Sequence, residues 1–254
     1  MGYDHLRIKS NAKAFYHNNS GWSMAVVVMG MFFATICAIV ARFIPFIGGL
    51  LVTPVSMLCG PVVMMGMLGW FRRTIYKPES PTAMFNVFTE NYWGKLGTML
   101  LMSLYVFLWS MLFVIPGYVK AYEYSMVPYI KEENPNMPAE KCFQLSRVMT
   151  YGHKADLFYL DLSFLGWHTL AALTLGIVGI LYAYPYYFSA RAFAYEELKA
   201  EAISLGKISP MEFPQNMSDP EPQQTYGQTY GQPSEQVYGT QQEKPSINLN
   251  KEDR

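Results

Sequence analysis

Long stretches without charge dominate the hydrophobic pattern of this chain. Four runs contain no Lys, Arg, Asp or Glu: residues 14–41, 43–71, 96–119 and 162–190. Each run exceeds the roughly 20 apolar residues that a helix needs to cross about 30 Å of hydrocarbon. The pattern therefore predicts an all-α fold, a polytopic transmembrane helix bundle.

Turn residues and charges divide these runs into about six predicted spans: 22–41, 55–71, 96–115, 117–131, 155–174 and 180–198. Most basic residues fall in the connections after the second and fourth spans. The positive-inside rule places these connections, and with them both termini, in the cytoplasm. Trp22, Trp70 and Trp93 fall at the same predicted inner interface, where tryptophan is enriched. The expected location is the cell membrane.

The fourth predicted span has an alternative. Residues 118–130 are only moderately apolar and include Lys120 and Glu123, so they fit either a surface helix or a crossing. If they stay outside the bilayer, the five basic residues of 120–154 lie on the external side. If they cross the bilayer, only Lys120 lies on the external side. The positive-inside rule favours the crossing.

Two backbone features lie within the apolar runs. Gly30, Ala34 and Ala38 recur every four residues, a spacing that lets a second helix approach closely. Pro54 and other helix-breaking residues interrupt the second run, so we expect a bent or partly re-entrant entry at 46–59 before the span at 55–71. Residues 45–61 are therefore the first place to look for a functional feature. A structural kink is favoured there over a functional break.

Three shorter segments mix apolar and charged residues: 3–19, 81–92 and 138–150. They are predicted to be short interfacial amphipathic helices on the cytoplasmic leaflet. Residues 207–254 differ in composition, with eight Gln, six Pro and the near repeats TYGQ, TYGQ and VYGT. Such a segment buries too little apolar surface to offset its ordering entropy. The chain thus divides into a transmembrane helical domain, 1–206, and a disordered cytoplasmic tail, 207–254.

Charge argues against one class of partner. The chain has 19 basic and 19 acidic side chains, which separate into a core of +3 and a tail of −3 on either side of Gly206. No basic cluster creates a long-range attraction to polyphosphate, so no nucleic-acid partner is expected.

Known chemical motifs are absent from the sequence. Cys37, Cys59 and Cys142 lack the C-x-x-C spacing and are expected to be free buried thiols. The four histidines are scattered along the chain, so we expect no metal site among them. There is no P-loop, hydrolase elbow, zinc-protease motif or dinucleotide fingerprint. We therefore expect no cofactor, no metal and no enzymatic activity.

Ionisable residues inside the predicted spans are the sharper signal, because each needs a partner or water in hydrocarbon. Asp161 lies seven residues from Lys154, about 10 Å deep at 1.5 Å per residue. Arg191 lies at a similar depth on the next helix, so the two are predicted to form an ion pair. His168 lies two helical turns beyond Asp161, on the same face. A register-fixing polar interior is favoured over a substrate or proton pathway.

Lys120 and Glu123 are one helical turn apart, at the predicted outer end of the fourth span. Oppositely charged residues at this spacing attract each other across the helix surface. The sequence therefore predicts a local outer pair rather than a functional site.

The second half of the chain carries recognisable blocks: the Pro116-Gly117 turn, YSMVPY (124–129), SRVMTYGHK (146–154), LDLSFLGW (160–167), TLGI (174–177) and AFAYEEL (192–198). With these blocks, residues 5–199 resemble a bacterial integral membrane family known as domain of unknown function nine-seven-five. The resemblance implies a polytopic plasma-membrane protein of a Gram-positive bacterium. It implies no reaction, substrate, cofactor or catalytic residue, and it does not include the tail.

Two functions remain open from the sequence. The favoured one is a non-enzymatic component that organises or regulates the cell envelope, with the lipid bilayer as its surroundings and a protein partner at the tail or at 138–150. The alternative is a small-solute transporter with a polar interior around Asp161, His168 and Arg191. An intramembrane enzyme ranks last, because no acid and base are paired.

Overall fold

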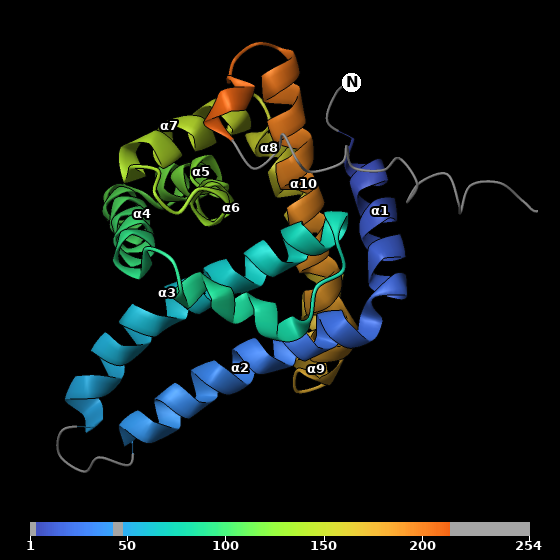
Figure 1. The fold of residues 1–254 in the computed structure, drawn as a ribbon. Coiled ribbons are helices and arrows are strands. Elements are labelled where there is room, and N and C mark those ends of the chain that lie inside the picture. The colour runs from blue at the N-terminus through green and yellow to red at the C-terminus, as the bar shows by residue number, and fades with distance from the viewer. Residues whose placement is uncertain (1–3, 43–47, 214–254) are drawn as a thin grey trace, which may run out of the picture.

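The computed structural model describes residues 4–42 and 48–213, and these residues form helices and connections without a strand (Figure 1). The elements are α1 (His5–Asn18), α2 (Ser20–Arg42), α3 (Gly48–Tyr76), η1 (Pro81–Phe88), α4 (Tyr92–Leu112), α5 (Val114–Glu123), α6 (Val127–Glu133), α7 (Ala139–Thr150), α8 (Lys154–Leu162), α9 (Leu165–Leu173), η2 (Gly179–Ala183), α10 (Tyr184–Ser204) and η3 (Pro210–Glu212). The predicted all-α class is therefore confirmed.

The first three predicted spans correspond to single helices, α2, α3 and α4, whereas the last three are each built from two pieces. Span four divides into α5 and α6 around residues 124–126. Pro128, at the start of α6, explains this break, because proline lacks the N–H donor and clashes with the carbonyl four residues earlier. Spans five and six likewise divide into α8 and α9 and into η2 and α10. Among the described residues, α4 is the one helix long and apolar enough to cross a membrane.

Helix α3 corrects the expected break at 45–61. It is helical from Gly48 to Tyr76 and contains both Pro54 and Pro61. A single proline removes one backbone donor, and apolar helices that pack on neighbours tolerate this loss. The first part of the predicted segment falls in residues 43–47, which lie outside the described residues.

The three predicted amphipathic segments are helical, and apolar residues of each are buried inside the protein. Phe15 of α1 is buried and its ring packs against Phe71 and Phe193. Met84 of η1 and Phe143 of α7 are also buried inside the protein. Their helical form is confirmed, whereas their placement at the membrane interface stays a prediction. At the sequence level a face that binds lipid and a face that binds a neighbouring helix have the same period.

Close backbone approach occurs at two glycines. A Cβ atom at Gly30 would lie 2.7 Å from the sulfur of Met67, so the first residue of the predicted small-residue stripe does permit close packing. The side chains of Ala34 and Ala38 lie outside the described residues. At Gly66 of α3 a Cβ atom would lie 2.3 Å from the backbone oxygen of Met84, which brings η1 directly against α3.

The packed fold continues beyond Gly206, the predicted domain boundary. Ile208 is 4% exposed and Phe213 is fully buried in the main apolar core. Lys141 of α7 also forms an ion pair with Glu212, 2.8 Å between Nζ and Oε1. The helical domain therefore extends to Phe213, and the rest of the predicted tail lies outside the described residues.

The tryptophans predicted at one interface differ in burial. Trp22 and Trp93 are 56% and 75% exposed, whereas Trp70 is fully buried and donates a hydrogen bond from Nε1 to the backbone oxygen of Ser80. Its role is to pack the core at the end of α3. Trp70 is therefore a core residue, and the common membrane level of the three tryptophans stays a prediction.

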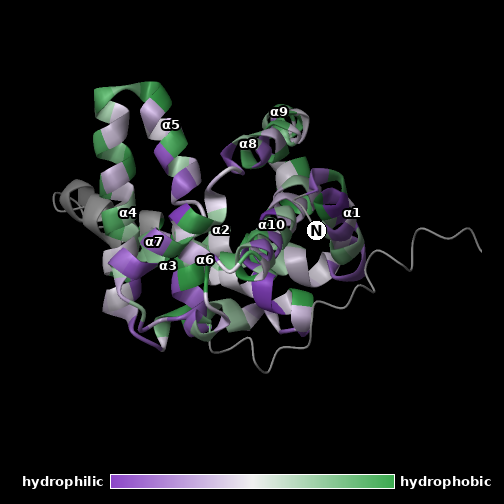
Figure 2. Cartoon of the chain, turned by 90° about the horizontal axis from the view of Figure 1, so that it is seen from above, coloured by the Kyte–Doolittle hydropathy of each residue, from purple (hydrophilic) through white to green (hydrophobic). Residues whose placement is uncertain are grey.

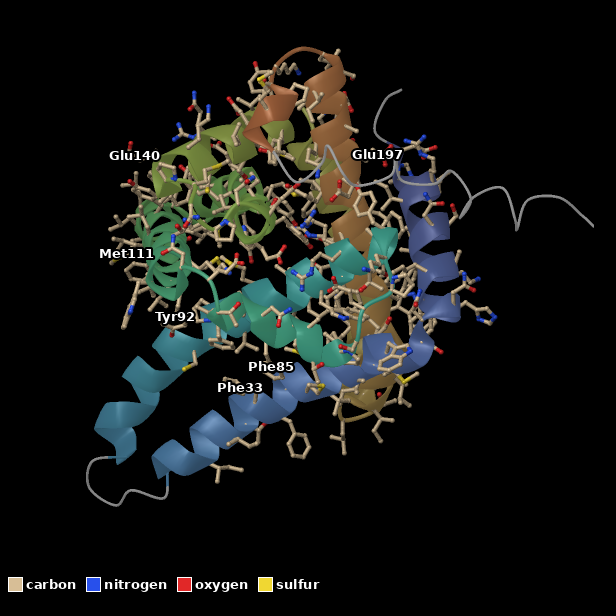
Figure 3. All side chains as sticks on the ribbon, viewed as in Figure 1. Phe33, Phe85, Tyr92, Met111, Glu140 and Glu197 are labelled. Carbon is tan, nitrogen blue, oxygen red and sulfur yellow. The ribbon has the colours of Figure 1, made fainter. Side chains whose placement is uncertain are left out.

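Exposed large apolar side chains are concentrated on particular helices. Figure 2 shows α4 and α5 as an antiparallel pair with an apolar end, which projects to the same side of the molecule as α9. Further exposed apolar residues lie on the outer half of α2, which pairs with α3 (Figure 1). Nearer the core, Phe33 of α2 faces Phe85 of η1 with 5.9 Å between ring centroids (Figure 3). The exposed set includes Phe32, Ile36, Phe107, Met111, Leu112, Phe113, Val114, Ile115, Leu165, Leu173, Leu175 and Ile177.

Candidate functional site

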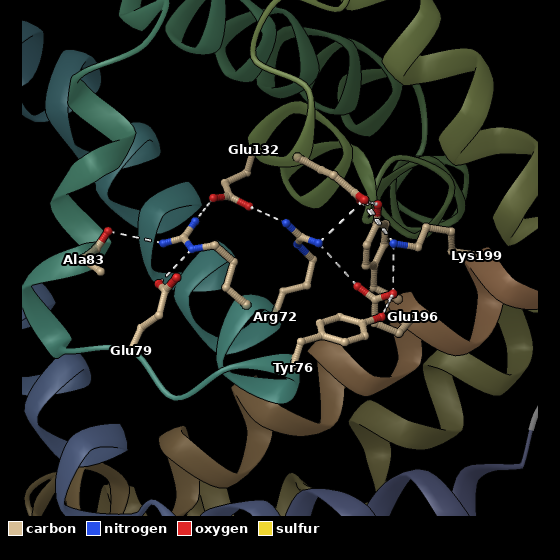
Figure 4. A network of polar contacts seen from close by, with 10 residues as sticks. Arg72, Tyr76, Glu79, Ala83, Glu132, Glu196 and Lys199 are labelled. Atoms are coloured by element: carbon tan, nitrogen blue, oxygen red, sulfur yellow. Dashed lines mark hydrogen bonds and ion pairs between the residues drawn. The ribbon is translucent and has the colours of Figure 1, made fainter. Parts of the chain in front are cut away.

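A buried ionic cluster joins α3, α6 and α10 (Figure 4). We use this name for Arg72, Glu132, Glu133, Glu196 and Lys199. Arg72 comes from the end of α3, the two adjacent glutamates from the end of α6, and the last two residues from α10. The three helices converge at this level, so charged residues from all three meet there.

Arg72 lies between the three carboxylates of the cluster. Its Nη2 is 3.4 Å from Glu132 Oε2, and its Nη1 is 3.7 Å from Glu133 Oε1 and 3.6 Å from Glu196 Oε1. Lys199 Nζ bridges two of these carboxylates, 3.2 Å from Glu133 Oε1 and 2.9 Å from Glu196 Oε2. Both cations therefore bind carboxylates that come from two different helices.

Two tyrosines complete the hydrogen bonding of these carboxylates. Tyr76 donates from its hydroxyl to Glu196 Oε2 over 2.6 Å, and Tyr195 donates to Glu133 Oε2 over 2.5 Å. The Tyr195 ring stacks on Tyr129 of α6, with centroids 4.9 Å apart. The tyrosines therefore hold both carboxylates in place and cover them from solvent.

At the edge of the cluster, Arg73 pairs with Glu132 and with Glu79, the latter at 3.0 Å between Nε and Oε2. Its Nη2 also donates to the backbone oxygen of Ala83, which attaches η1 to the same network (Figure 4). Counting Arg73, three cations face the three buried carboxylates. Because the charges are matched and each carboxylate has a cation beside it, the arrangement suits a structural lock between helices rather than a general base.

Burial makes this cluster energetically demanding. The side chain of Glu133 is fully buried, and those of Arg72 and Lys199 are each 4% exposed. Removing charges from water costs several kcal/mol per ion, which is recovered only when the partners stay in place. The cluster therefore favours one specific arrangement of α3, α6 and α10 and penalises any arrangement that separates them.

The predicted contact between Asp161 and Arg191 is present. Arg191 Nη1 lies 3.6 Å from Asp161 Oδ1, which is longer than a hydrogen bond. Asp161 accepts a hydrogen bond on its other oxygen from the hydroxyl of Tyr122, at 2.9 Å. Sequence reasoning missed Tyr122, which links α5 to α8 and, through Asp161, to α10.

His168 does not extend this polar pair along a straight helix. The chain turns at Ser163 and Phe164, between α8 and α9, so the two-turn spacing from Asp161 no longer defines one face. The His168 ring packs on aromatic rings, 5.4 Å from Tyr187 and 6.0 Å from Tyr184 between centroids. The three predicted residues therefore surround an aromatic interior rather than a line of polar groups.

The predicted pair of Lys120 and Glu123 is also present, 2.7 Å apart, but it has further partners. Lys154 Nζ lies 2.5 Å from Glu123 Oε2, and Arg147 Nε lies 3.8 Å from Glu123 Oε1. The sequence assigned Glu123 to the outer face of the membrane and Lys154 to the inner edge. These assignments are incompatible, because about 30 Å of hydrocarbon cannot separate two groups in contact.

Buried Cys142 provides a test of the packing of α7. Burial raises the pKa of its thiol to about 11, and the nearby Lys131 ammonium only partly offsets this effect. At pH 8 only about one Cys142 in a thousand is then a thiolate, the form that reacts with maleimides. We expect maleimide to modify Cys142 in denaturant but not in the native protein, with labelling followed by mass spectrometry.

Glu140→Cys, on the exposed face of the same helix, is the control for this experiment. Its thiol should react in the native protein under the same conditions. Equal native labelling of Glu140→Cys and Cys142 at pH 8 would contradict the observed burial of α7. Raising the pH toward 11 should increase the reactivity of any Cys142 that becomes accessible, because the thiolate fraction rises.

Sequence reasoning missed the ionic cluster, although the signal was present. Arg72 had been counted as a residue of a cytoplasmic connection, and Glu132, Glu133, Glu196 and Lys199 had no assigned role. All five lie within two residues of the end of a predicted span, 55–71, 117–131 or 180–198. Antiparallel helices of similar length bring such ends together, so oppositely charged residues at the inner ends of three predicted spans were candidates for one site. Among the described residues, no three His, Cys, Asp or Glu side chains converge on a metal position.

The fold and site define an all-helical protein whose helices are joined by buried ion pairs. Residues 112–202 match the family described as "Protein of unknown function (DUF975)". The resemblance seen in the sequence is confirmed over this segment, which extends from the end of α4 into α10 and includes every acidic residue of the ionic cluster. No curated protein and no solved structure matches the chain.

Proposed function

We propose that the protein is a multi-pass integral component of the cell membrane with a non-enzymatic, organising role. The ends of α4, α5 and α9, which project to the same side of the molecule, enter the bilayer from the cytoplasmic side, while the α2–α3 pair lies across this direction (Figures 1 and 2). This arrangement places both termini in the cytoplasm. It leaves the ionic cluster at the cytoplasmic base of these helices.

The observation that carries this proposal is the separation of exposed apolar ends from a charged base. Leu173, Leu175 and Ile177, where α9 leads to η2, are 62–95% exposed, and Met111 and Ile115 at the α4–α5 turn are 72% and 78% exposed. Exposed apolar patches of this kind need a partner surface, and the bilayer provides one. At the other end, charged side chains pair with one another.

The ionic cluster supports a scaffold rather than a moving or catalytic device. Arg72 by itself contacts carboxylates from both α6 and α10. Sliding one helix past another would therefore break several buried ion pairs at once. A partner would meet the polar face of α7, where Glu140 and Gln144 are exposed, since the apolar face of α7 is already buried. The C-terminal tail is the second proposed contact.

The alternative of a transporter has one observation in its favour. Asp161 Oδ1 and Arg191 Nη1 are buried and lack a hydrogen-bond partner, and the neighbouring η2 is a π-helix, a distortion often found at functional sites. A transporter would lose flux in Asp161→Asn without losing its fold, because asparagine still accepts from Tyr122. An organising protein should tolerate the change and should instead lose its partner when the tail is removed.

Membrane integration is tested by alkaline carbonate extraction of membranes from cells that express the full chain. We expect the protein to remain in the membrane pellet, because the apolar ends lie in hydrocarbon. Reconstituted wild type and Asp161→Asn should both leave an imposed pH gradient intact in dye-loaded vesicles. Release by carbonate would refute membrane integration, and Asp161-dependent dissipation of the gradient would favour the transporter.

A further inference from the structure

The α4–α5 hairpin, residues 104–119, has an apolar end that nothing in the described structure covers. Its turn side chains Phe113 and Ile115 are 67% and 78% exposed, and Tyr118 is 66% exposed. The two arms are closely packed, since a Cβ atom at Gly117 would lie 2.2 Å from the hydroxyl of Ser110. The hairpin is therefore a narrow apolar wedge, with α4 and α5 as its two sides (Figure 2).

The length of the α5 arm limits how deep this wedge can go. Only residues 113–119 separate the turn from Lys120, and seven residues span about 10 Å. Glu123 lies one turn further, roughly 15 Å from the turn. A complete crossing of about 30 Å would place these charges near the middle of the bilayer, whereas one leaflet matches the observed length.

The charges at this level come from three helices, so tilting α5 would not keep them out of the bilayer in a complete crossing. Arg147 of α7 and Lys154 of α8 surround Glu123 together with Lys120, and the Arg147 side chain is 55% exposed. An exposed arginine at the bilayer centre is costly. The polar face of α7 continues beyond it, and Glu140 at the start of that helix is also exposed.

This base fits a negatively charged surface. Three cations share the single carboxylate of Glu123, which leaves two positive charges in excess, and Lys120 and Lys154 are 24% and 32% exposed. Lys120 also lies 5.4 Å from the ring of Trp109, which is 41% exposed. Tryptophan beside a basic residue is typical of the headgroup layer, and basic residues near it attract anionic lipids.

From these observations we propose that the α4–α5 hairpin enters one leaflet without crossing the bilayer, and that Lys120, Arg147 and Lys154 bind the headgroups of anionic phospholipids. This inference deepens the proposed function and rests on membrane integration of the chain. It replaces the predicted crossing at 117–131, although α4 taken alone is long and apolar enough to cross. The α5 arm, not α4, sets the depth.

The depth is tested with Ile115→Cys in the full chain with Cys37→Ala and Cys59→Ala, which leaves only the buried Cys142. The introduced thiol carries an environment-sensitive fluorophore, and the protein is reconstituted into phosphatidylcholine vesicles containing phosphatidylglycerol. Nitroxide lipids carry the quencher near the headgroup or near the end of the acyl chain. We expect the chain-end quencher to be at least about twofold more effective, because a wedge of this length ends near the bilayer centre.

Glu140→Cys is the matched control, since it lies on the exposed face of α7. In sealed vesicles with the cytoplasmic face outside, a membrane-impermeant maleimide should label Glu140→Cys, whereas unmodified Ile115→Cys should stay unlabelled in vesicles of either orientation. Labelling of Ile115→Cys together with stronger quenching near the headgroup would show a complete crossing and overturn the proposal. If no lipid quenches the fluorophore although carbonate leaves the protein in the membrane, the hairpin proposal alone fails.

The headgroup contact is tested by the thermal midpoint of the protein in phosphatidylcholine with and without phosphatidylglycerol. We expect phosphatidylglycerol to raise the midpoint of the wild type, Arg147→Gln to lose at least half of this increase, and Arg147→Lys to retain it. Lys141→Gln, which removes a cation paired with Glu212 elsewhere on α7, should behave as wild type. An unchanged response of Arg147→Gln, or an equal increase with inorganic phosphate alone, would overturn the lipid assignment.

Discussion

Arg72→Ala is expected to lower the free energy of unfolding by about 3–5 kcal/mol, the usual cost of removing one partner from a buried ion pair. The loss comes mainly from what remains. Glu133 is fully buried and Glu196 is 7% exposed, so the substitution leaves two carboxylates with Lys199 as their shared cation. Thermal unfolding of the purified protein in detergent, followed by tryptophan fluorescence, measures the shift.

Arg73→Ala is the matched control, because Arg73 is the next residue of the same helix and also pairs with glutamates. Its side chain is 25% exposed, and one partner, Glu79, is 28% exposed; its buried partner, Glu132, keeps Arg72 beside it. Water can therefore replace much of the lost interaction, and we expect a loss of about 1 kcal/mol. Equal destabilisation by both substitutions would contradict the assignment of Arg72 to the centre of the cluster.

A double-mutant cycle separates the ion pair from the local effects of shortening Arg72. Glu133→Gln removes a buried negative charge but keeps an oxygen that can accept from Tyr195. Combined with Arg72→Ala, it should cost less than the sum of the two single substitutions, by about 1–3 kcal/mol, because the two residues act in one network. Strict additivity would show that Arg72 and Glu133 do not stabilise each other.

Trp70→Ala is expected to have a similarly large effect, a loss of about 3–5 kcal/mol of unfolding free energy. Trp70 is fully buried and packs edge-on against Phe71, with 5.1 Å between ring centroids. Truncation leaves a cavity at the end of α3 and removes the hydrogen bond to the backbone oxygen of Ser80. The same thermal unfolding assay, followed here by helical circular dichroism, measures the loss.

Two further substitutions make the origin of this effect clear. Trp93→Ala changes the same residue type at a position that is 75% exposed, and it should alter stability by no more than about 0.5 kcal/mol. Trp70→Phe keeps most of the ring but removes the donor, so it should lose about 0.5–1.5 kcal/mol for the hydrogen bond and somewhat more for the smaller volume. A tolerated Trp70→Ala would instead fit an interfacial anchor.

The positions of the helices were largely predictable, whereas their surroundings were not. Predicted amphipathic segments at 3–19, 81–92 and 138–150 correspond to α1, η1 and α7. The sequence could not distinguish a lipid-facing stripe from one that packs on another helix, since both repeat every 3.6 residues. Phe15 and Phe143 therefore looked like membrane contacts but are core residues.

Contacts in the candidate site were predictable only where two residues lay at the same expected depth in the membrane. Asp161 and Arg191 could be paired because both were counted from a charged end along neighbouring helices. The contact between Glu123 and Lys154 could not be found in this way, because it depends on the break after α5 and on the position of α7. Likewise, Arg72 meets Glu133 only because α3, α6 and α10 converge, and their contacts are far apart in the chain.

By itself, the sequence determined the helical class, the approximate helix positions and the local pairs, because hydrophobic period, charge spacing and turn residues act over a few residues. Only the tertiary structure decided which apolar faces are buried, which charges meet and that the packed core includes Phe213. Those outcomes depend on contacts between distant segments, as in the ion pairs of Arg72 and the burial of Phe213. Burial changes the energetic consequence of a charge or an aromatic ring, and burial is a property of the assembled helices.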